Sequence, residues 1–206
     1  MIELKNVTKT ISGKVILQDI NQIFREGQCY LISGPNGCGK TMLLRMLCGL
    51  IKATNGEVNG IKNKSFGVII ENPEFFKHET VLYNLEYLAA IQKKIDINII
   101  QQWIKVFNLS EQKDIRVRKL SLGMKQRLAL CQAFMENPDI LLLDEPFNAL
   151  DNENSIILKG VIENEKKNGK IIIIAAHNLS NDLLDLFDYQ IKMENGKIIK
   201  TAQIQM

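Results

Sequence analysis

The sequence predicts an α/β fold with a mostly parallel sheet, a small antiparallel β layer and an inserted helical subdomain. Short, continuous apolar runs rich in β-branched residues are typical of strands buried on both faces, as in parallel sheets covered by helices. Helical segments follow these runs repeatedly, which indicates right-handed β-α-β connections. Half-exposed strand patterns separated by turns occur near both ends of the chain and predict the antiparallel layer.

The buried strands are expected at residues 29–33, 67–70, 140–143 and 170–176. Helices are expected at residues 40–50, 80–92, 98–108, 121–136 and 154–167. Half-exposed strands are expected at residues 3–7, 15–24 and 56–58. Asn195-Gly196, between expected strands 189–193 and 197–200, is a strong hairpin signal. These elements predict one domain, 1–206, with a core and antiparallel layer from 1–79 and 137–206 and a helical subdomain over about 80–136.

Composition narrows the class of protein. A length of 206 residues suits one large domain, and 46% hydrophobic with 24% charged residues is typical of a globular protein. The longest apolar run, 171–176, is far shorter than the roughly 20 residues that span a bilayer. The first ten residues lack a signal-peptide core, so we expect a cytoplasmic protein. Lys and Arg number 26 against 23 Asp and Glu, a net charge of +3, so no nucleic-acid partner is expected.

A glycine-rich segment predicts a phosphate-binding loop. Residues 34–41 read Gly-Pro-Asn-Gly-Cys-Gly-Lys-Thr and match GxxxxGK[ST] between a strand and a helix. Glycines there let backbone N–H groups point at phosphate oxygens, and the helix adds its positive end. Lys40 can reach the β- and γ-phosphates, and the Thr41 hydroxyl can ligate Mg²⁺. The alternative is a turn that matches by chance. The predicted nucleotide-binding residues are Gly34, Pro35, Asn36, Gly37, Cys38, Gly39, Lys40, Thr41 and Met42.

Two acidic residues follow the apolar run 140–143. Asp144 and Glu145 therefore stand at the carboxyl end of a strand, where open α/β sheets bind ligands. Asp144 is predicted to hold Mg²⁺, and Glu145 to orient or deprotonate the attacking water. An ordinary strand end before a turn would explain these acids alone. Beside the phosphate-binding loop of a P-loop NTPase core, hydrolysis of a nucleoside triphosphate is the better interpretation, with Lys40 in the catalytic set.

Three further motifs follow in order. Residues 120–127 read Leu-Ser-Leu-Gly-Met-Lys-Gln-Arg and are similar to the LSGGQ signature. Residues 148–151, Asn-Ala-Leu-Asp, are similar to a D-loop, and His177 stands where a switch histidine is expected. Together these motifs resemble the ATP-binding cassette (ABC) ATPases, from residue 2 to about residue 200.

The resemblance implies that two cassettes meet head to tail, so that each signature closes over ATP on the other's P-loop. Ser121 and the Gly123 backbone would then donate to the partner's γ-phosphate, although Ser121 also fits a helix N-cap. The resemblance implies that His177 contacts the γ-phosphate and Glu145, whereas a lone histidine there would otherwise be a satisfied core residue. Asp151 would make a contact across the dimer; the alternative is an N-cap for the next helix.

Departures from the family pattern carry their own expectations. Glu71 stands where glutamine is usual; its carboxylate can still ligate Mg²⁺ or orient water, and its charge predicts tighter coupling to metal occupancy. Ile11 replaces the aromatic residue that usually stacks on adenine, so an apolar contact with the base is expected and GTP is not excluded. Leu122 and Met124 replace a glycine and a glutamine. The resulting signature resembles those of bacitracin-type and lantibiotic-immunity exporter cassettes.

We therefore expect an ATPase subunit of an ABC transporter, peripheral on the inner face of the cell membrane, that uses ATP and Mg²⁺. Its expected partners are a second cassette, as a homodimer or a close paralogue, and integral membrane permease subunits whose coupling helices contact residues 71–79 and the helical subdomain. Peptide or antibiotic export is the transport favoured by the signature. One alternative is a soluble cassette ATPase acting on nucleic acid or an assembly complex. Another is a degenerate module that binds nucleotide without hydrolysing it.

Overall fold

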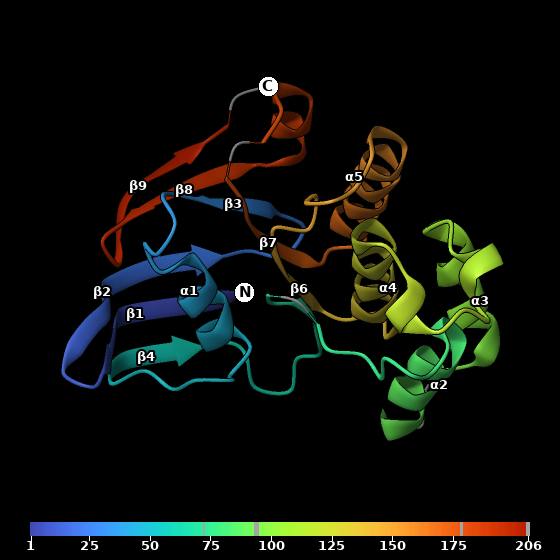
Figure 1. The fold of residues 1–206 in the computed structure, drawn as a ribbon. Helices are drawn as coiled ribbons and strands as arrows, with labels where there is room; N and C mark the ends of the chain where they lie inside the picture. The colour runs from blue at the N-terminus through green and yellow to red at the C-terminus, as the bar shows by residue number, and fades with distance from the viewer. Residues whose placement is uncertain (72, 93–94, 178, 205–206) are drawn as a thin grey trace.

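A computed structural model describes residues 1–206 except 72, 93–94, 178 and 205–206 (Figure 1). Its larger sheet has six strands in the order β5-β6-β7-β3-β8-β9, of which the first five are parallel and β9 is antiparallel to β8. This arrangement confirms the predicted α/β class. The strands of this sheet are β3 (Cys29–Ser33), β5 (Phe66–Ile69), β6 (Ile140–Asp144), β7 (Ile171–Ala175), β8 (Tyr189–Glu194) and β9 (Lys197–Gln203).

A second sheet is antiparallel and has the order β2-β1-β4. Its strands are β1 (Ile2–Ile11), β2 (Lys14–Phe24) and β4 (Asn55–Asn59). The C-terminal hairpin does not join it, so the expectation that both ends of the chain build this layer is wrong for β8 and β9. The physical reason is burial, because Ile191 and Met193 are fully buried where β8 pairs in parallel with β3.

Alternation of side chains gives the larger sheet two apolar faces. Tyr30, Leu142 and Ile173 belong to one buried cluster, and their sequence neighbours Leu31, Leu141 and Ile172 to the other. Strands buried on both faces are therefore continuously apolar, as the sequence indicates. The first face packs on α1 (Lys40–Leu47), which lies between the two sheets (Figure 1). The second face packs on α4 (Leu122–Met135) and α5 (Asn152–Lys167).

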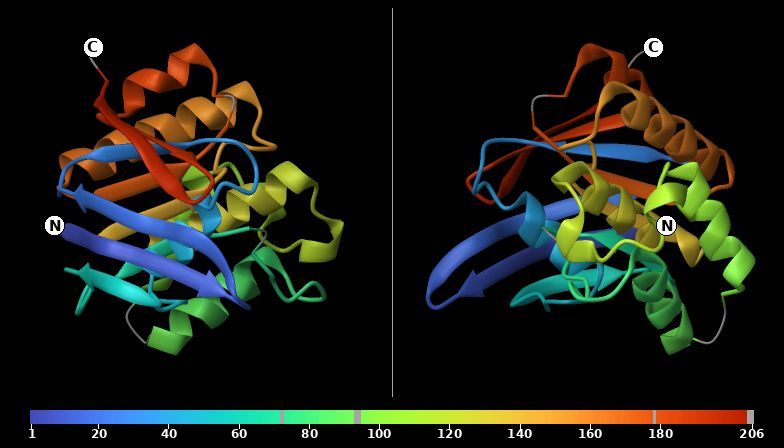
Figure 2. Two further views of the ribbon diagram at one scale, coloured as in Figure 1. Left: turned by 90° about the vertical axis from the view of Figure 1, so that its left-hand side faces the viewer. Right: turned by 45° about the vertical axis from the view of Figure 1, so that its right-hand side comes forward.

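The remaining helices are α2 (Val81–Gln92) and α3 (Ile97–Val106), with short 3₁₀ turns at Ser110–Gln112, Val117–Lys119 and Asn181–Leu186. Trp103 stacks on Phe107, and both rings make tilted contacts with Phe134, which joins α3 to α4. The two views in Figure 2 place the antiparallel sheet and the helices α3 and α5 on opposite sides of the molecule. The division into a core and a helical subdomain at about residues 80–136 stays a prediction.

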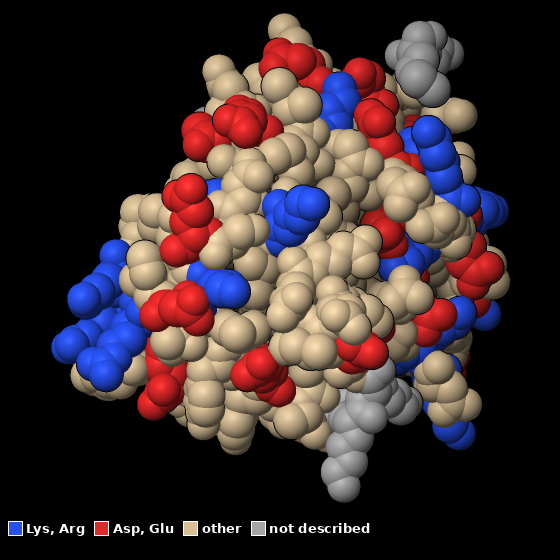
Figure 3. All heavy atoms as spheres, turned by 90° about the vertical axis from the view of Figure 1, so that its right-hand side faces the viewer, with Lys and Arg blue, Asp and Glu red and all other residues tan. Residues whose placement is uncertain are grey.

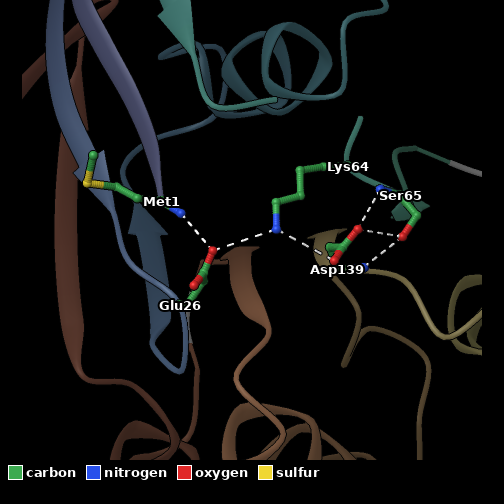
Figure 4. Close-up of polar contacts among 5 residues, drawn as sticks. All are labelled: Met1, Glu26, Lys64, Ser65 and Asp139. Carbon is green, nitrogen blue, oxygen red and sulfur yellow. Dashed lines mark hydrogen bonds and ion pairs between the residues drawn. The ribbon is translucent and has the colours of Figure 1, made fainter. Parts of the chain in front are cut away.

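Polar contacts tie together the amino ends of the parallel strands (Figure 4). The Met1 amine lies 2.9 Å from Glu26 Oε1, and Lys64 Nζ lies 3.7 Å from Glu26 Oε1 and 3.6 Å from Asp139 Oδ1. Asp139 Oδ2 accepts hydrogen bonds from Ser65 N and Oγ, both at 2.9 Å, and the backbone bond in particular lowers the pKa of Asp139. These partly exposed ion pairs contribute little stability individually, and they lie at the strand ends opposite to the acidic residues 144 and 145.

The hairpin tip between β8 and β9 supports the loop after β3. Gly196 N donates to Cys38 O at 3.0 Å, and Gly196 O accepts from Gln18 N at 2.8 Å. Gly196 has φ 77°, and an ideal Cβ there would lie 2.3 Å from Ile16 O. A side chain at this position would therefore separate the hairpin from β2 and from residue 38.

We predict that Gly196→Ala lowers the free energy of unfolding more than Gly169→Ala does. Both positions have positive φ, which costs alanine about 1–2 kcal/mol, but a Cβ at Gly169 meets nothing within 4 Å. The clash at Gly196 adds roughly 1–3 kcal/mol. Urea unfolding followed by fluorescence of the single tryptophan measures both variants. Equal losses would contradict close packing of the hairpin tip.

Candidate functional site

Four neighbouring strands of the larger sheet end at one edge. There β5 leads to Glu71, β6 to Asp144 and Glu145, β7 to His177 and β3 to residues 34–41. Parallel strands in the order β5-β6-β7-β3 bring their carboxyl ends together, and open α/β sheets bind ligands at such edges. A cleft of about 510 Å³ opens at this edge. Its lining residues are Ile16, Asn36, Gly37, Gly39, Lys40, Thr41, Met42, Glu71, Gln126, Asp144, Glu145, Asn148 and His177.

The loop 34–41 wraps around the amino end of α1. Gly34 has φ 151°, and an ideal Cβ there would lie 2.2 Å from Met193 O, so only glycine fits against β8. Lys40 is 7% exposed, and its Nζ donates to Gly34 O at 2.8 Å and to Pro35 O at 3.3 Å. The ammonium thus lies inside the loop that contributes it. Cys38 serves as a small filling residue of the loop, because its thiol is buried against Gly34.

Thr41 and Asp144 are joined directly. Thr41 Oγ1 donates to Asp144 Oδ2 at 2.6 Å. Burial raises the pKa of Asp144, and the negative charges of Glu145 and Glu71 raise it further, against the Thr41 bond and the Lys40 charge. Hydroxyl and carboxylate oxygens are the ligands that Mg²⁺ prefers. In the described residues no cluster of three or more His, Cys, Asp and Glu side chains forms a metal cage. The pair of Thr41 and Asp144 nevertheless suits Mg²⁺, because this ion is usually held by one or two carboxylates together with the phosphates of a substrate.

Glu145 and His177 form a contact at the centre of the edge. His177 Nδ1 lies against Glu145 Oε1. Glu145 has φ 50°, and its N–H donates to Ala175 O at 2.8 Å, which fixes its backbone to the end of β7. Asn148 N donates to Glu145 O at 3.1 Å and closes the turn. The carboxylate is therefore held by both the β6 and β7 ends.

Glu71 follows the edge strand β5 and lines the same cleft. Its Oε1 lies 2.7 Å from the guanidinium of Arg45 on α1. Its backbone has φ 59°, a left-handed conformation that is uncommon for a residue with a Cβ. Three carboxylates, those of Glu71, Asp144 and Glu145, thus line one cleft.

The signature residues lie at the start of α4. Ser121 is the N-cap, its Oγ accepting from Met124 N at 3.2 Å, and it is exposed and outside the cleft lining. An ideal Cβ on Gly123 would lie 2.6 Å from Ala149 O, so glycine allows α4 to approach the D-loop-like segment. Gln126 Nε2 donates to Pro146 O at 3.0 Å, directly after Glu145. The amino end of α4 is therefore attached to the turn after β6.

Asp151 is the N-cap of α5. Its Oδ1 accepts from Asn154 N and Asn154 Nδ2, both at 2.8 Å, and the backbone bond in particular lowers the pKa of Asp151. Within a single chain, Ser121 and Asp151 are therefore both helix N-caps, as one interpretation of each predicts. Their contacts across a dimer stay predictions.

Three cleft residues are absent from the sequence-based set. Gln126 and Asn148 lie within motifs that the sequence presents, but neither motif assigns them a contact. No sequence motif indicates that Ile16 on β2 lines the cleft. Ile11 is 41% exposed at the end of β1 and is not among the cleft-lining residues, so its contact with a base stays a prediction.

Similarity to known proteins identifies the class of protein that this arrangement defines. The family model described as ABC transporter matches residues 17–148. The chain therefore belongs to the ABC transporter family and is an ATP-binding cassette that hydrolyses ATP. Within the described residues, no helix has the length and apolarity needed to cross a membrane.

Individual relatives agree with this assignment. The chain is 40% identical to the uncharacterized ABC transporter ATP-binding protein YybJ of Bacillus subtilis (strain 168), over 99% of the chain and 97% of the relative. It is 31% identical to the lantibiotic transport ATP-binding protein SrtF of Streptococcus pyogenes, over 97% and 89%. Its structure matches the dimeric cassette MJ0796 with a TM-score of 0.89 and 26% identity, covering all of both chains.

We predict that Asp144→Asn stabilises the nucleotide-free protein at pH 8. A raised pKa means that folding disfavours the ionised carboxylate, so the wild type loses stability relative to the uncharged variant as pH rises through the folded-state pKa. The difference should shrink towards zero as pH falls to the unfolded-state value of about 3.9. Urea unfolding in EDTA at several pH values measures it. Asp114→Asn, at an exposed site, controls for the lost charge, and a variant less stable than wild type at pH 8 would contradict the prediction.

Proposed function

We propose that this cassette powers an ABC transporter by closing with a second cassette over two MgATP and reopening after hydrolysis. The observation that carries the proposal is the meeting of the P-loop, Asp144, Glu145 and His177 at one edge of one sheet. Positioned donors, an acid for a metal shell and a base for water are the parts that phosphoryl transfer to water requires.

Each side chain then has a chemical role. Lys40 leaves the carbonyls of its own loop and bonds the β- and γ-phosphates. Thr41 and Asp144 would hold Mg²⁺, with Glu71 beside them, and the ion would withdraw negative charge from the phosphate oxygens. Glu145 takes a proton from a water molecule while the oxygen of that water bonds to the γ-phosphorus. The bond between the γ-phosphorus and the ADP oxygen breaks in the same step.

His177 completes this machinery. Its contact with Glu145 orients the carboxylate, and its other ring nitrogen is available to the γ-phosphate. The strand ends β6 and β7 fix both residues, so little reorganisation accompanies the reaction.

The second cassette supplies what one cleft lacks. Ser121 and Leu122 are exposed at the amino end of α4, and Leu122 is 66% exposed although it is apolar. Neither lines the cleft of its own chain. An exposed helix N-terminus with a serine suits the phosphate of another chain's nucleotide. The dimeric state of the related cassette MJ0796 supports a pair of cassettes. We propose that the pair is head to tail, as a homodimer or with a close paralogue.

Integral membrane permease subunits are the proposed second partner, which places the cassette on the cytoplasmic face of the membrane. Three exposed aromatic side chains gather beside the segment that follows Glu71. Phe76 packs edge-on against Tyr87 at 4.8 Å between ring centroids, and Tyr83 stacks on Tyr87 at 6.4 Å. Exposed apolar clusters of this kind mark protein interaction sites. A coupling helix of a membrane subunit fits this surface.

We propose that the transporter exports a peptide or an antibiotic. The altered signature at Leu122 and Met124 supports it, as does the lantibiotic transport protein among the relatives. Other relatives include a spermidine/putrescine import protein of Spiroplasma citri, so the names of the relatives favour export only together with the signature.

A soluble ATPase that acts on nucleic acid or an assembly complex is the alternative. The face in Figure 3 carries acidic and basic residues interspersed, with one basic cluster at its left edge. Nucleic-acid binding requires a positive surface and weakens steeply with salt. Salt-dependent DNA or ribosome binding would favour the alternative, whereas co-purification with integral membrane proteins would favour the transporter.

We predict that Glu145→Gln binds ATP but hydrolyses it roughly 10²–10⁴-fold more slowly, the usual contribution of a general base. The variant should accumulate as an ATP-bound dimer, because the step that reopens the clamp is blocked. Phosphate release measures turnover and gel filtration with MgATP measures the dimer.

Two variants serve as comparisons. Glu194→Gln removes an exposed carboxylate on β8 and should leave turnover unchanged. Lys40→Ala should lose nucleotide binding itself. If Glu145→Gln turned over ATP within a few-fold of the wild-type rate, Glu145 would not be the general base. Reopening of the dimer would then not depend on Glu145 either.

A further inference from the structure

Arg45 has no part in the reaction described above, yet it holds one of the three carboxylates of the cleft. It lies on α1 four residues after Thr41, so both side chains project from one helix face. Its guanidinium nitrogen is 2.7 Å from Glu71 Oε1. We infer that Arg45 is a positioning residue that competes with Mg²⁺ for the Glu71 carboxylate and so sets how much Mg²⁺ the nucleotide-loaded site requires. This inference rests on the proposed function.

The ion pair is weak enough to exchange. The side chains of Arg45 and Glu71 are 35% and 61% exposed. Pairs exposed to this degree contribute about 0–1 kcal/mol. A divalent cation beside the triphosphate attracts a carboxylate more strongly than one guanidinium does in water. Glu71 can therefore pass from Arg45 to the metal without a large barrier from the pair itself.

The backbone at Glu71 gives the pair a second effect. Glu71 has φ 59°, and such conformations in residues with a Cβ persist where the surroundings hold them. β5 is the edge strand and ends two residues earlier, so the sheet fixes only one side of this turn. The Arg45 contact ties the Glu71 side chain to α1. Loss of Arg45 leaves the carboxylate free to approach Thr41 and Asp144.

The negative charge of the cleft explains why Glu71 has a positively charged partner. Glu71, Asp144 and Glu145 bring three carboxylates to one cleft, and Lys40 is the lysine among its lining residues. Lys40 Nζ donates to the carbonyls of Gly34 and Pro35. Arg45 offsets the Glu71 charge from outside the lining. A neutral glutamine at position 71 would not need this partner.

The test is a metal titration in place of an activity assay. Mn²⁺ binding to the protein loaded with a non-hydrolysable ATP analogue is followed by electron paramagnetic resonance. Arg45→Met should lower the Mn²⁺ concentration for half-saturation about 3–5-fold, the equivalent of a surface ion pair. Arg45→Lys, which keeps the charge, should stay within about twofold of wild type. Lys52→Met removes an exposed lysine just beyond α1 and controls for net charge.

The Glu71→Gln background separates positioning from a general charge effect. Arg45→Met should leave the Mn²⁺ titration of Glu71→Gln unchanged, because the competing pair is already lost. An unchanged titration in Arg45→Met alone, or an equal shift in both backgrounds, would overturn the inference while leaving the proposed function intact. Failure of the wild type to bind the analogue would overturn both. Thermal unfolding of each variant confirms that it is folded.

Discussion

The convergence of four parallel strand ends on one edge is the constraint on which the site depends. β5, β6, β7 and β3 are adjacent in the sheet, so the residues that follow them meet although the sequence separates them widely. The strands are held from both faces, by α1 on one side and by α4 and α5 on the other. This packing fixes the strand ends from which Glu145 and His177 extend. The hairpin tip at Gly196 supports the remaining component, the loop after β3.

The same convergence creates an electrostatic conflict. Three carboxylates line a partly buried cleft, and the pKa of Asp144 is raised by burial and by the other two. The folded protein therefore holds charges that it would be more stable without, a pattern typical of functional sites. Lys40, Arg45 and the Thr41 hydroxyl offset part of this repulsion. A divalent cation bound beside these carboxylates would offset more of it.

Much of this organisation is readable from the sequence, for identifiable reasons. Continuous apolar strands such as 140–143 indicate a covered parallel sheet, and the motifs at 34–41 and 144–145 predict which edge of that sheet lines the cleft. Local patterns did not reveal which strands neighbour one another, so the parallel pairing of β8 with β3 was missed. The Arg45–Glu71 pair, the approach of Gly123 to Ala149 and the cleft position of Ile16 depend on long-range packing. No spacing in the chain encodes them.

A crystal structure of the Glu145→Gln variant grown with MgATP tests the central claim most directly. The account predicts the triphosphate against residues 34–41, with Lys40 Nζ moved from the carbonyls of Gly34 and Pro35 to the phosphates. It also predicts Ser121 of a second copy on the opposite side of the same nucleotide. A nucleotide bound elsewhere, or a Lys40 that still bonds its own loop beside bound ATP, would contradict the account.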